Sequence, residues 1–323
     1  MRRRSIALVV LAAPVAVAVV VAAAATGWGT APAPRPSGRT ASFDPRTAVV
    51  VGPDIYVAGA SLTKDSRGVV AVSQDGGRTW SMALLDAPPV VRAASDGSSV
   101  WLATDCGGRN GGRCLLHGTA QGGWREVASQ PIDDLIAGPA GSLTTVVHPV
   151  RQPPRLAETD DGGSSWHDVI SPCPDSRVPI AIAGRTTLSH AVCGVWLPDQ
   201  GWVALDDWLL VRRDHARWET ISRSSGQSIE DLASYNLGAI ILTLGGGGWL
   251  QANGHLYRTQ DDAATWSRVD VDPSNALSVA AVAPIDAANA YVVLRTEGNP
   301  SRLMRGDSST GWTVVATWPW AWP

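Results

Sequence analysis

The stretch that decides the fold is Ser73-Gln74-Asp75-Gly76-Gly77-Arg78-Thr79-Trp80, and close copies of it stand at Thr159–Trp166 and Thr259–Trp266. Each copy places an Asp two residues after a Ser or Thr, continues through small residues to a second Ser or Thr, and ends on Trp. The third copy departs only at Ala263, where the other two carry Gly77 and Gly163. A turn that recurs with its chemistry intact indicates an internal repeat.

The tryptophans that end such turns define the period of the repeat. Their spacings are 44, 42, 52, 48 and 46 residues, for Trp80, Trp124, Trp166, Trp218, Trp266 and Trp312. Units of 40–50 residues made of short strands are typical of a β-propeller with one four-stranded sheet per blade. The sequence therefore predicts an all-β fold, a six-bladed β-propeller of four-stranded antiparallel blades.

Apolar runs separated by turn residues give the expected strands of each unit. The first unit has runs at 47–51, 55–59, 68–73 and 79–85, the second at 90–95, 99–104, 113–119 and 124–128, and the fifth at 229–234, 238–243, 255–259 and 265–269. The first run of each unit is small and apolar, as in Ala281–Ala283, which suits an innermost strand beside a central channel. No segment after the N-terminal one shows a sustained 3.6-residue period, so we expect no helix in the body.

The turn residues have a structural explanation. The Asp carboxylate can accept backbone N–H groups one turn onward, Gly supplies a positive φ, and Trp buries a large face between blades. We therefore assign a structural role, and neither catalysis nor metal binding, to Asp75, Gly77, Thr79, Trp80, Asp161, Gly163, Ser165, Trp166, Asp261, Thr265, Trp266, Asp307 and Trp312.

The same residues carry a family resemblance. Ser73–Trp80 and Thr159–Trp166 match the Asp-box pattern S/T-x-D-x-G-x-T/S-W at every specified position. Over residues 46–317 the chain resembles the Asp-box (BNR-repeat) β-propellers, which include sialidases, sortilin-type receptors and the photosystem II assembly factor. The resemblance implies that a ligand would use the rim opposite the Asp-box turns.

The N-terminus predicts export. Arg2–Arg4 precede residues 6–25, which carry no charge, so residues 1–28 are expected to be a signal peptide or a membrane anchor. Residues 29–45 are predicted as a Pro-rich linker and residues 46–323 as the propeller. The protein would then be extracytoplasmic, secreted or held at the membrane through residues 6–25.

The cysteines and the charge balance narrow the function further. An even number of cysteines in an exported chain suggests two disulfides, and of the three possible pairings sequence proximity favours Cys106–Cys114 and Cys173–Cys193. A zinc site is the alternative, but the chain has no C-x2-C pair. With 26 basic and 29 acidic residues, the chain lacks the basic excess that sequence-independent nucleic-acid binding needs. We expect no cofactor.

The rim loops supply the candidate ligand-binding residues. In blades four and five these loops are predicted at Gly194–Asp206 and Leu244–Asn253, the second of which contains the glycine run Gly245–Gly248. Arginines there suit carboxylates or phosphates, and tryptophans suit sugar rings or protein partners: Arg67, Arg109, Arg151, Trp196, Trp202 and Trp249. Two plainer explanations stay open. Arg is the usual basic residue of this chain, which has only one lysine, Lys64, and a Trp can simply pack a long loop.

The predicted function is an exported non-catalytic propeller that binds an extracytoplasmic protein or glycan on that rim. The alternative is a sialidase-like exo-glycoside hydrolase. The F/Y-R-I-P motif of sialidases is missing at Phe43-Asp44-Pro45-Arg46, and the sequence does not bring together the two carboxyl groups that glycosidases need. We therefore assign no catalytic residue.

Overall fold

The computed structural model describes residues 43–63, 65–106, 114–119, 121–149, 151–184, 187–199, 202–214, 217–223, 237–243, 246–272, 274, 277–295, 300–307 and 311–318. The chain divides into two units, Met1–Pro32 and Ala33–Pro323, and the described residues lie in the second. Within them, no helix is long and apolar enough to cross a bilayer. The predicted signal or anchor, residues 1–28, lies outside the described residues.

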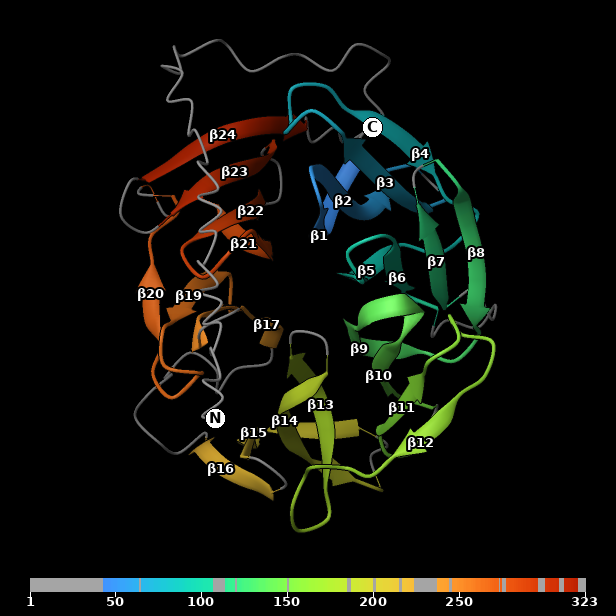
Figure 1. The fold of residues 1–323 in the computed structure, drawn as a ribbon, viewed down its shortest axis with the longest axis vertical. Coiled ribbons are helices and arrows are strands. Elements are labelled where there is room, and N and C mark those ends of the chain that lie inside the picture. Colours follow the sequence, from blue (N-terminus) through green and yellow to red (C-terminus); the bar gives the residue numbers. More distant parts are fainter. Residues whose placement is uncertain are drawn as a thin grey trace, which may run out of the picture. The chain divides into compact units, whose positions relative to one another are not determined.

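Six four-stranded antiparallel sheets form the second unit and surround a common centre (Figure 1). Their strands are β1 (Phe43–Val51), β2 (Asp54–Ser61), β3 (Gly68–Ser73), β4 (Ser81–Leu84), β5 (Val90–Ser95), β6 (Val100–Thr104), β7 (Leu115–Thr119), β8 (Gly123–Ala128), β9 (Ile132–Ala137), β10 (Leu143–Val147), β11 (Arg155–Thr159), β12 (His167–Val169), β13 (Arg177–Gly184), β14 (Leu188–Leu197), β15 (Trp202–Asp214), β16 (Arg217–Arg223), β17 (Leu237–Leu242), β18 (Gly248–Ala252), β19 (His255–Thr259), β20 (Ser267–Val269), β21 (Ser278–Pro284), β22 (Asn289–Arg295), β23 (Ser301–Asp307) and β24 (Gly311–Trp318). This arrangement confirms the predicted six-bladed propeller.

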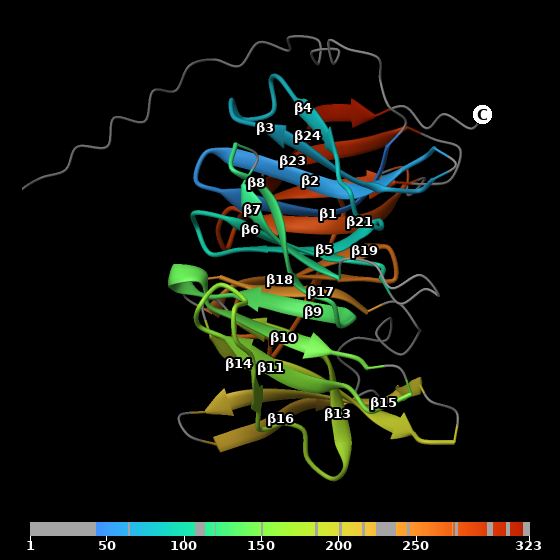
Figure 2. The ribbon, with the colours of Figure 1, turned by 90° about the vertical axis from the view of Figure 1, so that its right-hand side faces the viewer.

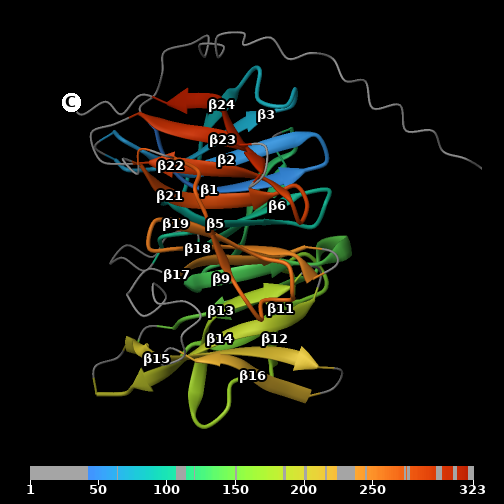
Figure 3. The same ribbon diagram turned by 90° about the vertical axis from the view of Figure 1, so that its left-hand side faces the viewer.

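Each blade is built from four consecutive strands in sequence order, with the first strand innermost. Because neighbours are antiparallel, the turns between strands one and two and between three and four lie on one face, which we call the Asp-turn face. The loops between strands two and three and the links between blades lie on the other, the mouth face. In Figures 2 and 3 the short helix η1 (Pro139–Gly141) and the start of β15, at Trp202, accordingly lie on opposite sides.

Blades four and five differ from the expected strands. The predicted rim loop Gly194–Asp206 is mostly a β-hairpin, in which Leu197 pairs with Trp202. In blade five the predicted first strand, 229–234, lies outside the described residues, and the sheet begins at β17 with the segment predicted as the second strand. The predicted loop Leu244–Asn253 is wrong in part, because Gly248–Ala252 is strand β18.

The polar turns have the expected hydrogen bonds. Asp75 accepts the Thr79 amide at 2.8 Å and the Thr79 hydroxyl at 2.7 Å, while the Ser73 hydroxyl accepts the Gly77 amide at 2.7 Å. These bonds, with that of the Thr79 side chain foremost, lower the pKa of Asp75 to about 2. The Asp75 carboxylate therefore makes its hydrogen bonds within its own turn and stabilises it.

The tryptophans after the turns pack between blades, as predicted. Each contacts a different hydrophobic cluster shared by two neighbouring blades: Trp80, Trp124, Trp166, Trp218, Trp266 and Trp312. The indole N–H of Trp80 also donates to the Gly77 carbonyl at 3.0 Å, which fixes the ring against its turn.

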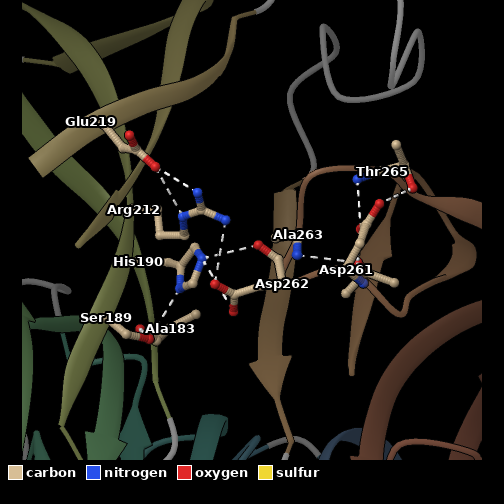
Figure 4. A network of polar contacts seen from close by, with 10 residues as sticks. Ala183, Ser189, His190, Arg212, Glu219, Asp261, Asp262, Ala263 and Thr265 are labelled. Carbon is tan, nitrogen blue, oxygen red and sulfur yellow. Dashed lines mark hydrogen bonds and ion pairs between the residues drawn. The ribbon is translucent and has the colours of Figure 1, made fainter. Parts of the chain in front are cut away.

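The third copy of the turn is held by a neighbouring blade (Figure 4). Asp262 and Ala263 take φ values of 58° and 66°, where the first two copies have glycines. His190 of blade four, only 1% exposed, lies with Nε2 3.3 Å from the Asp262 carbonyl, and Arg212 lies 3.5 Å from its carboxylate. A left-handed non-glycine residue costs about 1–2 kcal/mol. The contacts from His190 and Arg212 offset that cost.

Ring closure brings the first and last strands together. Phe43, the only Phe of the chain, packs edge-on against Trp318 with ring centroids 5.7 Å apart. Trp80 also packs edge-on against Trp318, with ring centroids 5.3 Å apart. Asp44 accepts Arg295 Nη1 at 2.8 Å across 251 residues of sequence. Among the described strands, none is exchanged between blades one and six. Side-chain packing and this ion pair therefore close the ring.

Two neighbouring glycines test the packing of a turn between blades. A Cβ at Gly77 would lie 2.0 Å from Val315 Cγ1 of blade six, whereas a Cβ at Gly76 would meet no atom within 4 Å. Both have positive φ. We expect Gly76→Ala to cost about 1–2 kcal/mol and Gly77→Ala about 1–3 kcal/mol more, in urea unfolding. Equal losses would contradict the proposed contact between blades.

The closing contact gives a second prediction. Phe43 is 1% exposed at the junction of blades one and six. We expect Phe43→Ala to lower the free energy of unfolding by about 3–5 kcal/mol, because a large buried ring is lost. Leu84→Ala, at a side chain that is 52% exposed, should change it by less than about 0.5 kcal/mol. A similar effect of both variants in urea unfolding would exclude side-chain closure.

Candidate binding site at the channel mouth

A β-bulge interrupts the innermost strand of every blade near its mouth-face end. The register slips at Arg46, Val91, Asp133, Ile180, residues 238–239 and Ala280. A bulge leaves an extra residue unpaired and redirects its side chain. Six bulges therefore ring the mouth of the central channel, and the residues they carry differ in chemistry from blade to blade.

Three arginines line a cavity of about 630 Å³ at this mouth: Arg46, Arg92 and Arg295. They come from strands β1, β5 and β22. Asp44, only 5% exposed, orients two of them, because its carboxylate accepts Arg46 Nε at 3.0 Å and Arg295 Nη1 at 2.8 Å. Gln251, Asn253 and Ser278 add polar groups from blades five and six. The mouth thus combines cations with uncharged hydrogen-bonding groups.

Arg92 is the arginine with spare donor capacity. Its Nε is enclosed and has no hydrogen-bond partner among the described residues, and its nearest carboxylate oxygen, on Asp134, is 3.9 Å away. The Asp134 oxygens instead accept the backbone N–H groups of Leu135 at 3.0 Å and Ile182 at 2.9 Å, the latter on blade four. Asp134 therefore links two inner strands rather than neutralising Arg92 at contact distance.

Burial raises the pKa of Asp134 to about 6, against the lowering effects of Arg92 and the two backbone N–H groups. Since the folded state holds the proton more tightly than the unfolded chain, stability is highest while Asp134 is protonated. The free energy of unfolding falls by about 3 kcal/mol as pH rises from about 4 to about 6. Below pH 6 the mouth becomes more cationic, because Arg92 then faces a neutral acid.

Blades three and four complete the rim with a histidine and a tryptophan. His148 Nδ1 lies 2.9 Å from the Asp133 carboxylate, and its ring meets the edge of Trp196 with centroids 6.0 Å apart. Trp196 is half-buried in the β14–β15 hairpin. Burial raises the pKa of Asp133, while His148 and, more weakly, Arg92 lower it. The cluster therefore lies within electrostatic reach of the arginines.

None of the arginines at this cavity was predicted, and of the predicted ones Arg67 and Arg151 do not line it. Arg67 donates through Nε to the Leu85 carbonyl at 3.1 Å and lies 3.7 Å from Asp86, so it fastens the exit of blade one. Arg151 is exposed in the β10–β11 loop with φ 59°. Arg109 lies outside the described residues, as does the side chain of Trp202. The predicted cluster of Arg67, Arg109 and Arg151 thus stays a prediction.

Trp249 does not lie on the rim, and its placement in a rim loop was wrong. It is fully buried in β18, where its Nε1 donates to the Asp286 carbonyl at 3.0 Å and its ring packs edge-on to Trp312. A Trp in this position fills the space between blades five and six. The glycines before it suggested a loop because Gly248, which begins the strand, has no side chain.

Both predicted disulfides are present. Cys106 pairs with Cys114 and Cys173 with Cys193, with Cα–Cα distances of 5.1 and 5.6 Å. Two disulfides indicate an oxidising, extracytoplasmic setting. In the part of the chain that the structure describes, no cluster of three or more His, Cys, Asp or Glu could hold a metal ion.

Comparison with known proteins supports the fold class and identifies no family for the chain. No family model and no curated protein sequence matches the chain. Among solved structures, the chain is similar to a variant of the Aleuria aurantia lectin bound to α-methyl-L-fucoside, with 13% identity, 88% of this chain and 98% of that chain covered, and a TM-score of 0.54. It is also similar to the GH74 xyloglucanase from Xanthomonas campestris, with 18% identity, 84% and 47% covered, and a TM-score of 0.50. YCF48 from Cyanidioschyzon merolae gives 14% identity, 86% of both chains and a TM-score of 0.46. The class is thus the six-bladed β-propeller.

The electrostatic interaction between Arg92 and Asp134, which lie 3.9 Å apart, gives a pH-dependent prediction. We expect Arg92→Gln to raise the pKa of Asp134 above about 6, because the cation that favours the carboxylate is removed. The variant should be less stable than wild type at pH 7 and equal to it at pH 4, where Asp134 is protonated in both. Urea unfolding at the two pH values measures this. Arg268→Gln, at an exposed arginine of β20, is the control, and an equal loss at both pH values would exclude the ionic explanation.

Proposed function

We propose that the protein is an exported, non-catalytic propeller that binds a carboxylate-bearing glycan or protein segment at the channel mouth. The observation that carries the proposal is the convergence of Arg46, Arg92 and Arg295 on one cavity. Guanidinium groups bind carboxylates through paired N–H donors, and the Arg92 side chain lines the cavity with 30% of its surface exposed. A long ligand would continue over Trp196 toward Arg151, which extends the site along the rim.

Export is the second part of the proposal. The disulfides agree with an oxidising compartment, and the charge-free residues 6–25 behind Arg2–Arg4 supply the signal or anchor. The turns at Asp75, Asp161 and Asp261 support membership of the Asp-box propellers, because the bonds that they make are those the pattern requires. Their carboxylates serve the turns and leave ligand binding to the opposite face.

Binding is favoured over hydrolysis by what the carboxylates at the mouth already do. Glycosidases need one carboxyl group to donate a proton and another to attack or to activate water. Asp44 is held by two arginines, Asp134 accepts two backbone N–H groups, and Asp133 pairs with His148. The sialidase-like alternative therefore lacks a free pair among the described mouth residues, and we propose recognition without turnover.

Charge-neutralising variants of the mouth test the proposal. Purified protein would be applied to a panel of sialylated and uronic-acid glycans and to acidic peptides. We expect Arg92→Gln to weaken acidic-ligand binding at least about tenfold, because a partly desolvated ion pair is lost. Arg268→Gln removes the same charge from an outer strand and should leave the affinity within about twofold. Equal losses would show nonspecific attraction and overturn the assignment of the mouth.

A further inference from the structure

The mouth leads into a second cavity. A channel of about 590 Å³ runs between the innermost strands of all six blades. It shares four lining residues with the mouth: Arg46, Arg92, Gln251 and Ala280. The two cavities therefore adjoin, with Arg46 and Arg92 at the boundary.

Aliphatic side chains form much of the channel wall beneath the arginines. All six inner strands contribute to it, including Val49, Ala93, Leu135, Ile182, Ile240 and Ala280. Thr47, Ser95 and Thr243 also line the channel, and each inner strand, as the first of its sheet, has one backbone edge on the channel side. Its other charged lining residues are Asp134, which accepts backbone N–H groups of two blades, and Asp286, which accepts N–H groups of Ala288 and Asn289 in its own turn. Between these ends an alkyl chain would contact the aliphatic side chains, whereas an acidic group would find no cation among the described lining residues.

We propose that the passage binds a single-chain anionic amphiphile, with its acidic head at Arg46, Arg92 and Arg295 and its alkyl chain in the channel. This inference rests on the proposed function and specifies its ligand as an acid that carries an acyl or alkyl tail. The head is either a simple carboxylate or an acidic sugar. From Arg46 to Val50 strand β1 advances about 13 Å, which sets the scale of the chain that the channel can cover.

The asymmetry of the passage fixes the orientation of the ligand. A carboxylate placed deep in the channel would be desolvated among aliphatic groups, far from the guanidinium donors. At the boundary it would meet the guanidinium group of Arg92, whose side chain is 30% exposed and lines both cavities. With the head at the arginines, the alkyl chain extends into the channel. Head and tail should thus contribute separately, which makes the proposal testable in two parts.

A chain-length series measures the two parts. Binding of butanoate, hexanoate, octanoate, decanoate and dodecanoate would be followed by calorimetry below their aggregation thresholds, beside the matching alcohols and alkyltrimethylammonium ions. We expect the affinity of the acids to rise about fourfold for each methylene until the chain fills the channel. At equal length, acids should bind at least about tenfold tighter than alcohols, and the cationic series weakest. Dodecyl glucuronide binding tighter than dodecanoate would identify the head as an acidic sugar, and the reverse as a simple carboxylate.

Variants separate the mouth from the channel. Arg92→Gln should abolish the preference for acids over alcohols and keep the dependence on chain length. Ala93→Phe, at a residue that lines the channel and not the mouth cavity, should abolish the dependence on length and leave the short acids unchanged, with Ala94→Phe as the second plug. Arg268→Gln is the charge control. Thermal melting establishes that each variant folds.

The possible outcomes decide between the two proposals. Binding of acids without any dependence on chain length would overturn the amphiphile and leave the mouth as a carboxylate site. Equal binding of acids and alcohols, unaffected by Arg92→Gln, would overturn the role of the arginines. Length dependence that persists in both plugged variants would place the alkyl chain outside the channel and overturn the inference. Acidic glycans that bind while every amphiphile fails would support the proposed function alone.

Discussion

The Asp44 carboxylate links the closure of the ring to the candidate site. Within residues 43–318, the described strands of blades one and six are not exchanged, and side chains join the two blades, among them Phe43 and Trp318. Asp44 holds Arg295 across that closure and Arg46 on its own strand. Two of the three arginines at the mouth are therefore placed by the same contact that joins the ends of the fold. A ring that opened at this junction would lose its binding geometry at the same time.

The bulges explain how a repeated fold acquires a site with different sides. Every inner strand has a bulge at its mouth-face end, so the backbone offers six similar positions. Side chains break the symmetry, with Arg46 on blade one, Asp133 on blade three, and Ile180 and Ala280 on blades four and six. The repeat supplies the shape of the mouth, and single residues at equivalent positions determine which ligand chemistry it suits.

The fold could be predicted because its determinants are local, whereas the site could not. A turn such as Ser73–Trp80 makes its hydrogen bonds within eight residues, and six tryptophans repeat its spacing. The arginines come instead from residue 46, directly after the predicted linker, from residue 92 beside a bulge, and from the end of β22. Ring closure alone brings Arg295 to Asp44, over 251 residues. The glycines before Trp249 led to the wrong prediction of a loop there, because a strand that starts on glycine has the composition of a loop.

The distribution of carboxylates argues that this propeller separates its structural acids from its recognition surface. On the Asp-turn face, Asp75 and Asp161 have their pKa lowered to about 2 by the Ser and Thr donors of their own turns, so they stay ionised and occupied. On the mouth face, Asp134 has its pKa raised to about 6 by burial, beside an arginine that it does not contact closely. Acids committed to turns cannot compete for a ligand. Asp44 pairs with Arg46 and Arg295, whereas the acid nearest Arg92 is weakly ionised in mildly acidic surroundings, so Arg92 is the arginine that meets an incoming carboxylate with little internal competition.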